Sequence, residues 1–141
     1  MTDVERARQV FGGNYFAQWI GCDIEEVGPG YARCSMKVRP EHMNALGRVM
    51  GGAIYTLADF AYAVASNFDR DVYVTQNSNI RFLYGARGGT LMAEAREVRS
   101  GKTSCLFEIE IRDEEGNLVA HVTAGGHLVK KRKENQWDGF C

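Results

Sequence analysis

The sequence predicts an α+β domain in which an antiparallel β-sheet curls around one long apolar helix. Three observations favour this class. The segment 51–68, GGAIYTLADFAYAVASNF, is longer than an ordinary strand and rich in alanine, which is typical of a buried helix. Four later segments alternate apolar and polar residues with the period of half-buried strands. Tight turns separate these segments, as in antiparallel hairpins.

Before the long helix, the chain is expected to form one helical segment and two strands. These are an N-terminal helical segment (1–20, amphipathic over 4–20 and broken at Gly12-Gly13), a strand (22–27), a turn (28–30) and a second strand (31–38), which Pro40 ends. Residues 41–50, EHMNALGRVM, show no periodicity and predict an irregular loop. The helix that follows is apolar nearly all round, so we expect it to be buried on all sides.

After the helix, four strands are expected, with hairpin turns at 99–101 and 113–117. The strands are 72–83, 90–99, 103–112 and 118–129. Residues 130–141 are charged and aperiodic and predict a flexible tail. No repeat or linker divides the chain, so residues 1–141 are expected to be a single domain.

Composition excludes several classes of function. The formal net charge is -1, from 17 basic and 18 acidic residues spread along the chain, so no patch for nucleic acid is expected. The start, MTDVERARQV, lacks the apolar core of a secretion signal, and no later apolar run is long enough to span a bilayer. We therefore expect a cytoplasmic protein that does not bind membranes.

The cysteines and histidines do not predict a redox or metal site. Three of the four cysteines, Cys22, Cys34 and Cys105, fall in strand segments where cysteine serves as a small apolar residue, and Cys141 ends the chain. The three histidines have no metal-ligand spacing. No metal and no resident cofactor are expected.

Asp59 stands out as the one charged residue of the long helix. A carboxylate in apolar surroundings is costly unless it is paired or used. One interpretation is structural, with Thr56, Ser66 or Tyr62 bonding the carboxylate. The other is functional, and the residues alone leave both open.

The functional interpretation depends on a spacing. Gly51 and Gly52 begin the helix, where free backbone N–H groups and the positive end of the helix dipole favour an oxyanion. Asp59 comes eight residues later, about 12 Å along the axis, too far to share one carbonyl with them. Two such helices packed antiparallel across a two-fold axis would place the start of one beside the middle of the other. A helix face of alanines (53, 58, 61 and 65) is compatible with such close packing.

The stretch HMNALGRVMGGAIYTLADFAYAVASN resembles a family signature, H-x-N-x-x-G-x-x-H-G-G-x-x-x-x-L-x-D. This signature belongs to hotdog-fold acyl-CoA thioesterases of the PaaI and thioesterase superfamily member 2 branch, and the resemblance covers about residues 22–129. It implies a hotdog fold, an acyl-CoA substrate that itself brings the coenzyme A, and sites shared between subunits of a homodimer that pairs into a tetramer.

The resemblance also implies roles for individual residues. The backbone N–H of Gly51 would polarise the thioester carbonyl, and Asp59 would be the catalytic carboxylate, as a general base or as a nucleophile. Asn44 would orient the thioester or the water, and Thr75 would hold the water. Thr75 also fits an ordinary strand residue.

Further residues match the family at the substrate. His42 is the first motif histidine, although a structural hydrogen bond fits a loop histidine equally well, and Gly52 adjoins the oxyanion donor. Met50 replaces the second motif histidine, and its thioether cannot donate a hydrogen bond, which puts substrate placement in doubt. Arg99 and Lys102 flank a glycine turn that would face the nucleotide phosphates. Candidates for the acyl pocket, each also a candidate for the core, are Tyr55, Phe60, Tyr62 and Phe82.

Two alternatives to thioester hydrolysis follow from the same residues. A non-catalytic homo-oligomer that binds acyl-CoA or an aromatic ligand is motivated by Met50. Hydration or dehydration of an acyl thioester would need a histidine on the central helix, and 51–68 has none. Neither the acyl group nor the choice between dimer and tetramer follows from the sequence.

Overall fold

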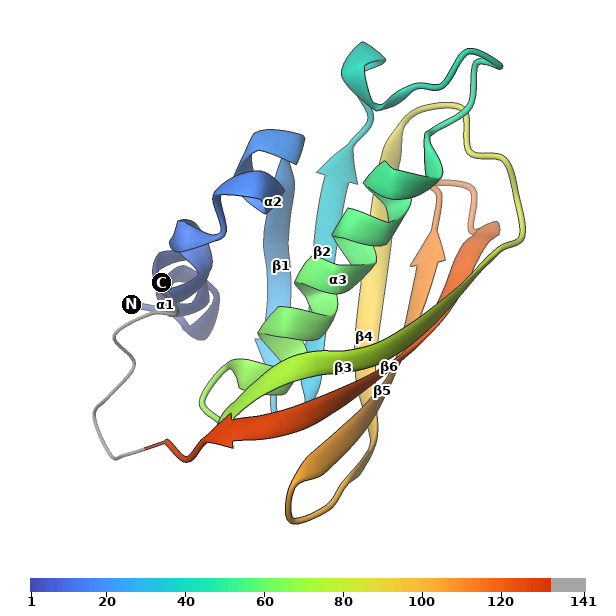
Figure 1. The fold of residues 1–141 in the computed structure, drawn as a ribbon. Helices are drawn as coiled ribbons and strands as arrows, with labels where there is room; N and C mark the ends of the chain where they lie inside the picture. Colours follow the sequence, from blue (N-terminus) through green and yellow to red (C-terminus); the bar gives the residue numbers. More distant parts are fainter. Residues whose placement is uncertain (133–141) are drawn as a thin grey trace.

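In the computed structural model, which describes residues 1–132, a six-stranded antiparallel sheet curls around one long helix (Figure 1). The strand order is β1-β2-β4-β5-β6-β3, and α3 crosses the concave face of the sheet. The predicted α+β class is therefore confirmed.

The elements occur in the predicted order. They are α1 (Asp3–Val10), a 3₁₀ turn (Phe11–Gly13), α2 (Tyr15–Ile20), β1 (Cys22–Gly28), β2 (Tyr31–Lys37), a second 3₁₀ turn (Pro40–His42), α3 (Gly51–Asn67), β3 (Val72–Phe82), β4 (Thr90–Ser100), β5 (Ser104–Arg112) and β6 (Leu118–Lys130). The N-terminal helical segment is interrupted at its glycine pair, as predicted. Residues 133–141, and with them Cys141 and most of the expected tail (130–141), lie outside the described residues.

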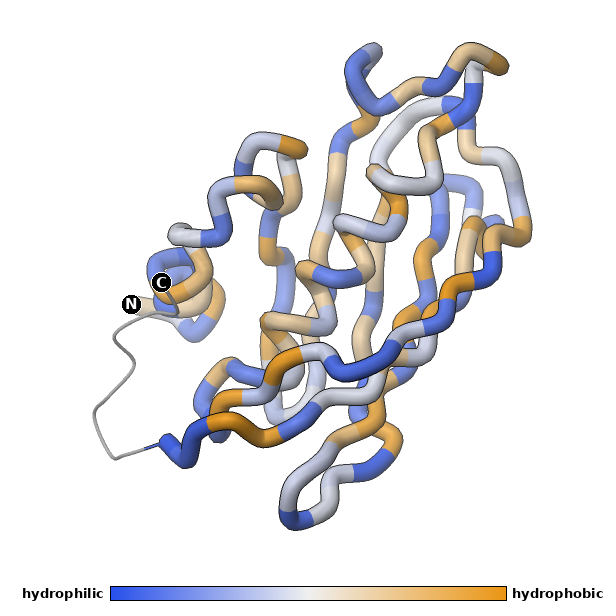
Figure 2. The backbone as a smooth tube through the Cα atoms, in the orientation of Figure 1, coloured by the Kyte–Doolittle hydropathy of each residue, from blue (hydrophilic) through white to orange (hydrophobic). Residues whose placement is uncertain are grey.

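The core lies between α3 and the sheet. Along β5, Cys105, Phe107, Ile109 and Ile111 are buried and alternate with more exposed residues. Figure 2 shows this alternation of hydrophobic and hydrophilic positions along the strands. The thiols of Cys22, Cys34 and Cys105 are free and buried, and burial raises the pKa of Cys22 to about 12. Such thiols are weak nucleophiles at neutral pH.

A glycine in β6 lets one aromatic residue of α3 approach the sheet closely. A Cβ at Gly126 would collide with the hydroxyl of Tyr62 and would lie 2.8 Å from Cys105 Sγ. The Tyr62 ring packs edge-on against Phe107, with 5.5 Å between ring centroids. Glycine at position 126 therefore fixes how deeply Tyr62 sits, one turn after Asp59 on the same helix.

The N-terminal segment is held to the rest of the fold by arginines of α1. Arg6 donates two hydrogen bonds of 2.6 Å to the carboxylate of Asp69, just after α3, and lies over the ring of Phe68. Arg8 pairs with Asp23 of β1 at 3.0 Å. These contacts fix the segment beside α3 and place α2 next to the middle of that helix.

The expectation that α3 is buried on all sides is wrong for the single chain. A stripe of α3 (Gly52, Tyr55, Thr56, Asp59 and Ala63) is exposed or half-buried, because the sheet packs on the opposite side of the helix. The neighbouring strand β3 is an edge of the sheet, and all residues of 74–79 are exposed. One chain therefore leaves a helix stripe and an adjoining strand edge uncovered.

Candidate active site

Asp59 lies in the middle of α3 on the uncovered stripe, between the buried residues Ala58 and Phe60. Within residues 1–132, no hydrogen bond or ion pair reaches its carboxylate. Its apolar surroundings disfavour the ionised form and raise the pKa of this carboxyl group. Asp59 is thus an unpaired acid whose pKa lies above its ordinary range.

The three residues proposed as structural partners of Asp59 make other bonds. Thr56 Oγ1 donates to the Gly52 carbonyl at 2.8 Å, and Ser66 Oγ donates to the Tyr62 carbonyl at 2.7 Å. The Tyr62 hydroxyl lies 3.6 Å from Cys105 Sγ. Within the described part of one chain, the structural interpretation of Asp59 therefore has no support.

Two hollows meet at Asp59. The strand-side hollow, about 240 Å³, lies between α3 and β3 and is lined by Asn14, Asp59, Tyr62, Val74 and Thr75 among others. The helix-side hollow, about 290 Å³, lies between α2 and α3 and is lined by Asn14, Tyr15, Phe16, Thr56, Asp59 and Phe60 among others. The carboxylate therefore has free space on two sides.

Thr75 shares the strand-side hollow with Asp59, so the structure brings together these two residues, to both of which the resemblance assigns a catalytic role. A bulge in the pairing of β3 with β6 lies between Thr75 and Asn77. Bulges re-aim side chains and are common beside active sites. Thr75 is exposed, and its hydroxyl can both donate and accept a hydrogen bond.

The start of α3 offers unpaired backbone donors. The N–H of Met50 donates to the His42 carbonyl at 2.7 Å, and the N–H of Ala53 donates to the Met50 carbonyl at 3.0 Å. Between them, the N–H groups of Gly51 and Gly52 meet no acceptor among the described residues. The ring of Phe82 packs on Gly51, and the side chain of the preceding residue, Met50, is exposed.

Asn44 organises the loop before α3. Its Oδ1 accepts hydrogen bonds from the N–H groups of Leu46, at 2.9 Å, and Arg48, at 3.1 Å. Its own N–H donates to the Arg48 carbonyl at 2.7 Å. These bonds leave the side-chain NH₂ as the group with which Asn44 could orient a ligand, and Asn44 lines neither hollow beside Asp59.

His42 is buried, with 2% of its surface exposed, and both of its ring nitrogens are bonded. Nδ1 accepts from the Arg39 N–H at 3.0 Å, and Nε2 lies 2.7 Å from the Ile20 carbonyl. A carbonyl only accepts, so Nε2 carries the hydrogen and the ring is the neutral tautomer. The side chain of His42 therefore joins the end of α2 to the 3₁₀ turn 40–42.

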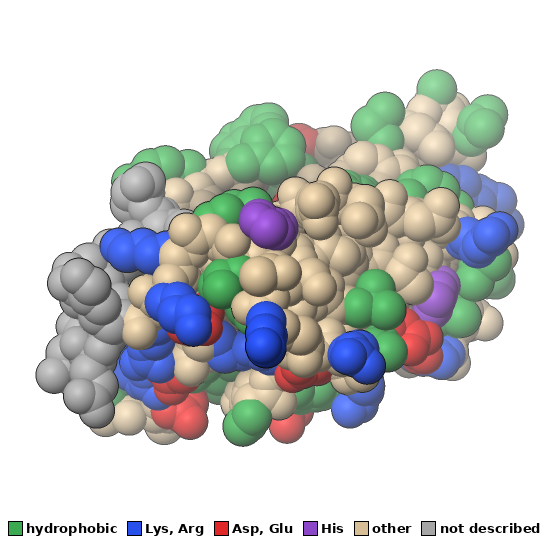
Figure 3. Space-filling model, turned by 60° about the horizontal axis from the view of Figure 1, so that its bottom comes forward, with side chains coloured by type: hydrophobic (Ala, Val, Ile, Leu, Met, Phe, Trp, Pro, Cys, Tyr) green, Lys and Arg blue, Asp and Glu red, His purple; other side chains and the backbone are tan. Residues whose placement is uncertain are grey.

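Arg99 and Lys102 lie on the β4–β5 hairpin, at the end of the molecule opposite the start of α3 (Figure 1). Both are exposed. On the face seen in Figure 3, Lys and Arg side chains are scattered among acidic ones rather than gathered in one patch. One chain therefore does not bring this turn to Met50 and Gly51.

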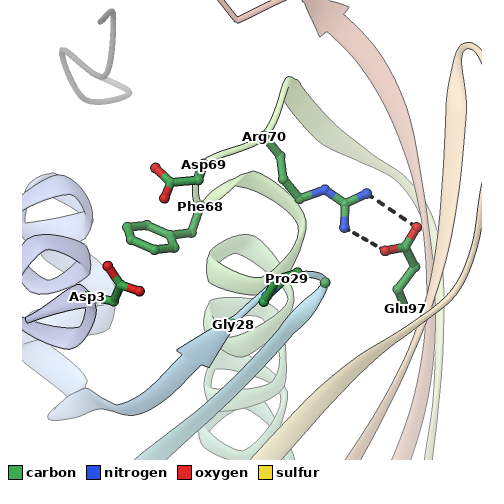
Figure 4. Close-up of a pocket in the computed structure, with 8 residues that line it drawn as sticks. Asp3, Gly28, Pro29, Phe68, Asp69, Arg70 and Glu97 are labelled. Atoms are coloured by element: carbon green, nitrogen blue, oxygen red, sulfur yellow. Dashed lines mark hydrogen bonds and ion pairs between the residues drawn. The ribbon is translucent and has the colours of Figure 1, made fainter. Parts of the chain in front are cut away.

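A separate cavity of about 360 Å³ lies near the end of α3, where Arg70 pairs with Glu97 at 2.8 Å (Figure 4). Asp59 does not line it. Within residues 1–132, no group of three or more His, Cys, Asp or Glu side chains is placed to hold a metal ion. No helix in that range is long and apolar enough to cross a bilayer.

Sequence reasoning missed the contribution of α2 to the site. Asn14 lines both hollows, and Tyr15 and Phe16 line the helix-side hollow. The available signal was YFAQWI, in which three large aromatic residues share a six-residue helix. Of the acyl-pocket candidates, Phe60 and Tyr62 line a hollow, whereas Tyr55 lines neither and Phe82 packs on Gly51.

The bonds of His42 predict a stability effect. His42→Leu leaves the Ile20 carbonyl and the Arg39 N–H without their partner and should lower the free energy of unfolding by about 1–3 kcal/mol. His42→Gln, whose amide can both donate and accept, should lose less. Urea unfolding at constant slope measures the difference. Glu41→Gln changes an exposed neighbour, and its free energy of unfolding should stay within about 0.5 kcal/mol of that of the original protein. An equal loss of stability in all three variants would contradict a stabilising role for the hydrogen bonds of His42.

Comparison with known proteins agrees with this geometry. Residues 46–120 match the family model of the thioesterase superfamily. The chain is 29% identical to the acyl-coenzyme A thioesterase PaaI of Escherichia coli, covering 89% of this chain and 90% of that protein. It is 30% identical to human acyl-coenzyme A thioesterase 13, over 74% of this chain and 78% of that protein.

Solved structures show the same fold. The E. coli PaaI structure superimposes with a TM-score of 0.83 at 28% identity, covering 92% of this chain and 98% of that one. A Streptococcus mutans protein bound to acetyl CoA gives a TM-score of 0.76 at 26% identity, covering 80% and 92%. The chain therefore belongs to the thioesterase superfamily and is a thioester hydrolase with the hotdog fold, similar to PaaI.

Proposed function

We propose that this thioester hydrolase cleaves acyl-CoA, with an aryl or medium-chain acyl group, into the free acid and CoA. Both relatives described above carry the name acyl-coenzyme A thioesterase, and a structural neighbour was solved bound to acetyl CoA. The observation that carries the proposal is the Asp59 carboxylate, which has no partner among residues 1–132, lines two hollows and shares one of them with Thr75.

The site is composite and forms between two copies of the chain. Asp59 of one copy and the Gly51 N–H of the other act on the same carbonyl, because about 12 Å of helix separates them within one chain. The uncovered stripe of α3 and the open edge of β3 support pairing about a two-fold axis, since both would be covered by the second copy. Pairing of such dimers into a tetramer, and a cytoplasmic location, remain expectations.

Hydrolysis with Asp59 as general base needs one proton transfer at each stage. The carboxylate takes a proton from a water held with Thr75, and the water oxygen attacks the thioester carbon. The carbonyl oxygen becomes an oxyanion that accepts from the Gly51 N–H. The C–S bond then breaks, the acid is released, and the CoA thiolate takes the proton from Asp59.

Asp59 acting as nucleophile would use the same two groups. The carboxylate would attack the thioester carbon, expel the CoA thiolate and form a mixed anhydride, which water then hydrolyses. The raised pKa of Asp59 suits either route, because a weaker acid has a stronger conjugate base.

The remaining residues would place the substrate. The side-chain NH₂ of Asn44 and the backbone of Gly52 would orient the thioester at the oxyanion donor, and Met50 would offer apolar contact where the family has a histidine. His42 is proposed to act on the substrate through the loop it supports. Arg99 and Lys102 of the copy that supplies Asp59 would face the nucleotide phosphates of CoA, because the antiparallel arrangement turns the hairpin end of that copy toward the Gly51 of the other.

Asp59→Asn tests the function directly. The variant should lose about 10² to 10⁴ in kcat in a thiol-release assay over a panel of acyl-CoAs, because an amide cannot take the proton. Asp3→Asn, an exposed acid on α1, is the matched control and should keep its activity. A folded Asp59→Asn protein with near-normal turnover would contradict the proposal. Ligand-induced stabilisation without thiol release would favour a non-catalytic binding protein instead.

The same variant predicts a pH dependence of stability. A carboxyl whose folded pKa is raised above its ordinary value of 3.8 binds protons more tightly when folded, so its contribution to stability falls as pH rises through the folded pKa. Asp59→Asn should therefore match the original protein at low pH and become more stable than it above that pKa. Urea unfolding across the pH range measures the difference in stability between the two proteins. If Asp59→Asn were more stable at low pH and lost this advantage at neutral pH, the predicted direction of the pH dependence would be wrong.

A pair of substitutions at Gly51 tests the backbone donor. Position 51 is the first residue of α3, where proline fits a helix, and Met50 is extended, as a residue before proline prefers. Alanine and proline both bring a Cβ against the Phe82 ring, but only proline removes the N–H. Gly51→Pro should therefore lose about 10² to 10³ in kcat relative to Gly51→Ala. Equal rates would exclude this N–H as the oxyanion donor.

A further inference from the structure

The short helix α2 presents three large aromatic side chains to solvent. Tyr15 is 79% exposed, Phe16 62% and Trp19 72%, whereas Ala17 points into the core. Neighbouring aromatic side chains that are this exposed commonly mark a site of binding or interaction. The Phe16 and Trp19 rings pack against each other, with 6.0 Å between ring centroids.

These aromatic residues adjoin the proposed reaction centre. Tyr15 and Phe16 line the helix-side hollow, and Asp59 lines the same hollow from α3. Phe60 and Ala63 complete its apolar wall. A thioester whose carbonyl lies at Asp59 therefore has an apolar, partly aromatic space within reach of its acyl chain.

The position of α2 is fixed by hydrogen bonds to the ends of its backbone. Arg39 Nη2 donates to the Trp19 carbonyl at 2.7 Å, and His42 Nε2 donates to the Ile20 carbonyl at the same distance. The His42 carbonyl, in turn, accepts from the Met50 N–H at the start of α3. One residue thus links the aromatic helix to the end of α3 that carries the free N–H groups.

We propose that α2 forms the wall of the site that selects the acyl group, with His42 as the residue that positions this wall. Tyr15 and Phe16 contact the acyl chain, and Trp19 supports Phe16 from behind. The wall favours acyl groups with a large apolar body over acetyl. This inference rests on the proposed function, and its tests separate the two.

The first test compares substrates. Phe16→Ala should lower the ratio of kcat/KM for decanoyl-CoA to that for acetyl-CoA by about tenfold or more, because one or two lost apolar contacts discriminate by that amount. Phe16→Leu should recover part of the ratio. Gln18→Ala, an exposed residue of α2 that lines neither hollow, is the matched control and should leave the ratio unchanged.

The positioning role has its own readout. Arg39→Ala and His42→Gln keep Tyr15 and Phe16 but weaken or change the bonds that hold α2. Both variants should raise KM for decanoyl-CoA more than KM for acetyl-CoA. Only Arg39→Ala removes the hydrogen bond to the Trp19 carbonyl completely. A general loss of folding would instead lower the active fraction equally for both substrates, and that result would overturn the positioning role.

The second test does not need catalysis. The chain has two tryptophans, Trp19 and Trp137, so Trp137→Phe leaves Trp19 as the sole tryptophan. Titration with S-decyl-CoA, a thioether that is not hydrolysed, should shift the Trp19 emission to shorter wavelength, because the decyl chain displaces water around Phe16, whose ring packs against that of Trp19. Unmodified CoA should not produce this shift.

The outcomes separate the two proposals. A shift with S-decyl-CoA in a protein that hydrolyses no acyl-CoA would overturn the proposed function and support the wall. Normal hydrolysis with no shift of the Trp19 emission would overturn the proposal that α2 selects the acyl group. An unchanged ratio of kcat/KM values in Phe16→Ala, with normal hydrolysis, would also overturn it. An unchanged ratio together with a smaller native mass in Phe16→Ala would show that α2 is a contact between copies of the chain, which also overturns it.

Discussion

Asp59 comes eight residues after Gly51, whose N–H meets no acceptor among the described residues, and a rigid α-helix puts the two residues about 12 Å apart along its axis. A thioester carbonyl is far smaller. A donor for its oxygen and a base for the attacking water must both lie within hydrogen-bond reach of it. The proposed mechanism therefore requires two helices, one to supply each group to the same carbonyl.

The uncovered parts of the single chain fit this requirement. The sheet packs on one side of α3 and leaves the stripe with Gly52, Thr56 and Asp59 open, next to the exposed edge strand β3. Asp59 has no partner among the described residues, and the raised pKa of its carboxyl group predicts lower stability at neutral pH than at low pH. Proteins accept such a loss at functional sites, where a perturbed carboxyl group is useful.

Local rules in the sequence predicted most of the fold. Alternation along 104–112, the turn at 113–117 and the alanine-rich run at 51–67 each depend on residues that are close in the chain. The resemblance to the family assigned catalytic roles to Asp59 and Thr75, which line the same hollow. The role of α2 did not, because Tyr15 and Phe16 reach Asp59 only through tertiary contacts, made by Arg6, Arg39 and His42, that no local pattern encodes.

Mixing of subunits tests the shared site most directly. Asp59→Asn and Gly51→Pro chains, each nearly inactive alone, would be unfolded together and refolded at equal amounts. If each site takes its acid from one chain and its N–H from the other, half of the dimers are mixed and each mixed dimer has one intact site, so about a quarter of the original activity should return. Activity that stays at the average of the two parents would contradict a site shared between subunits.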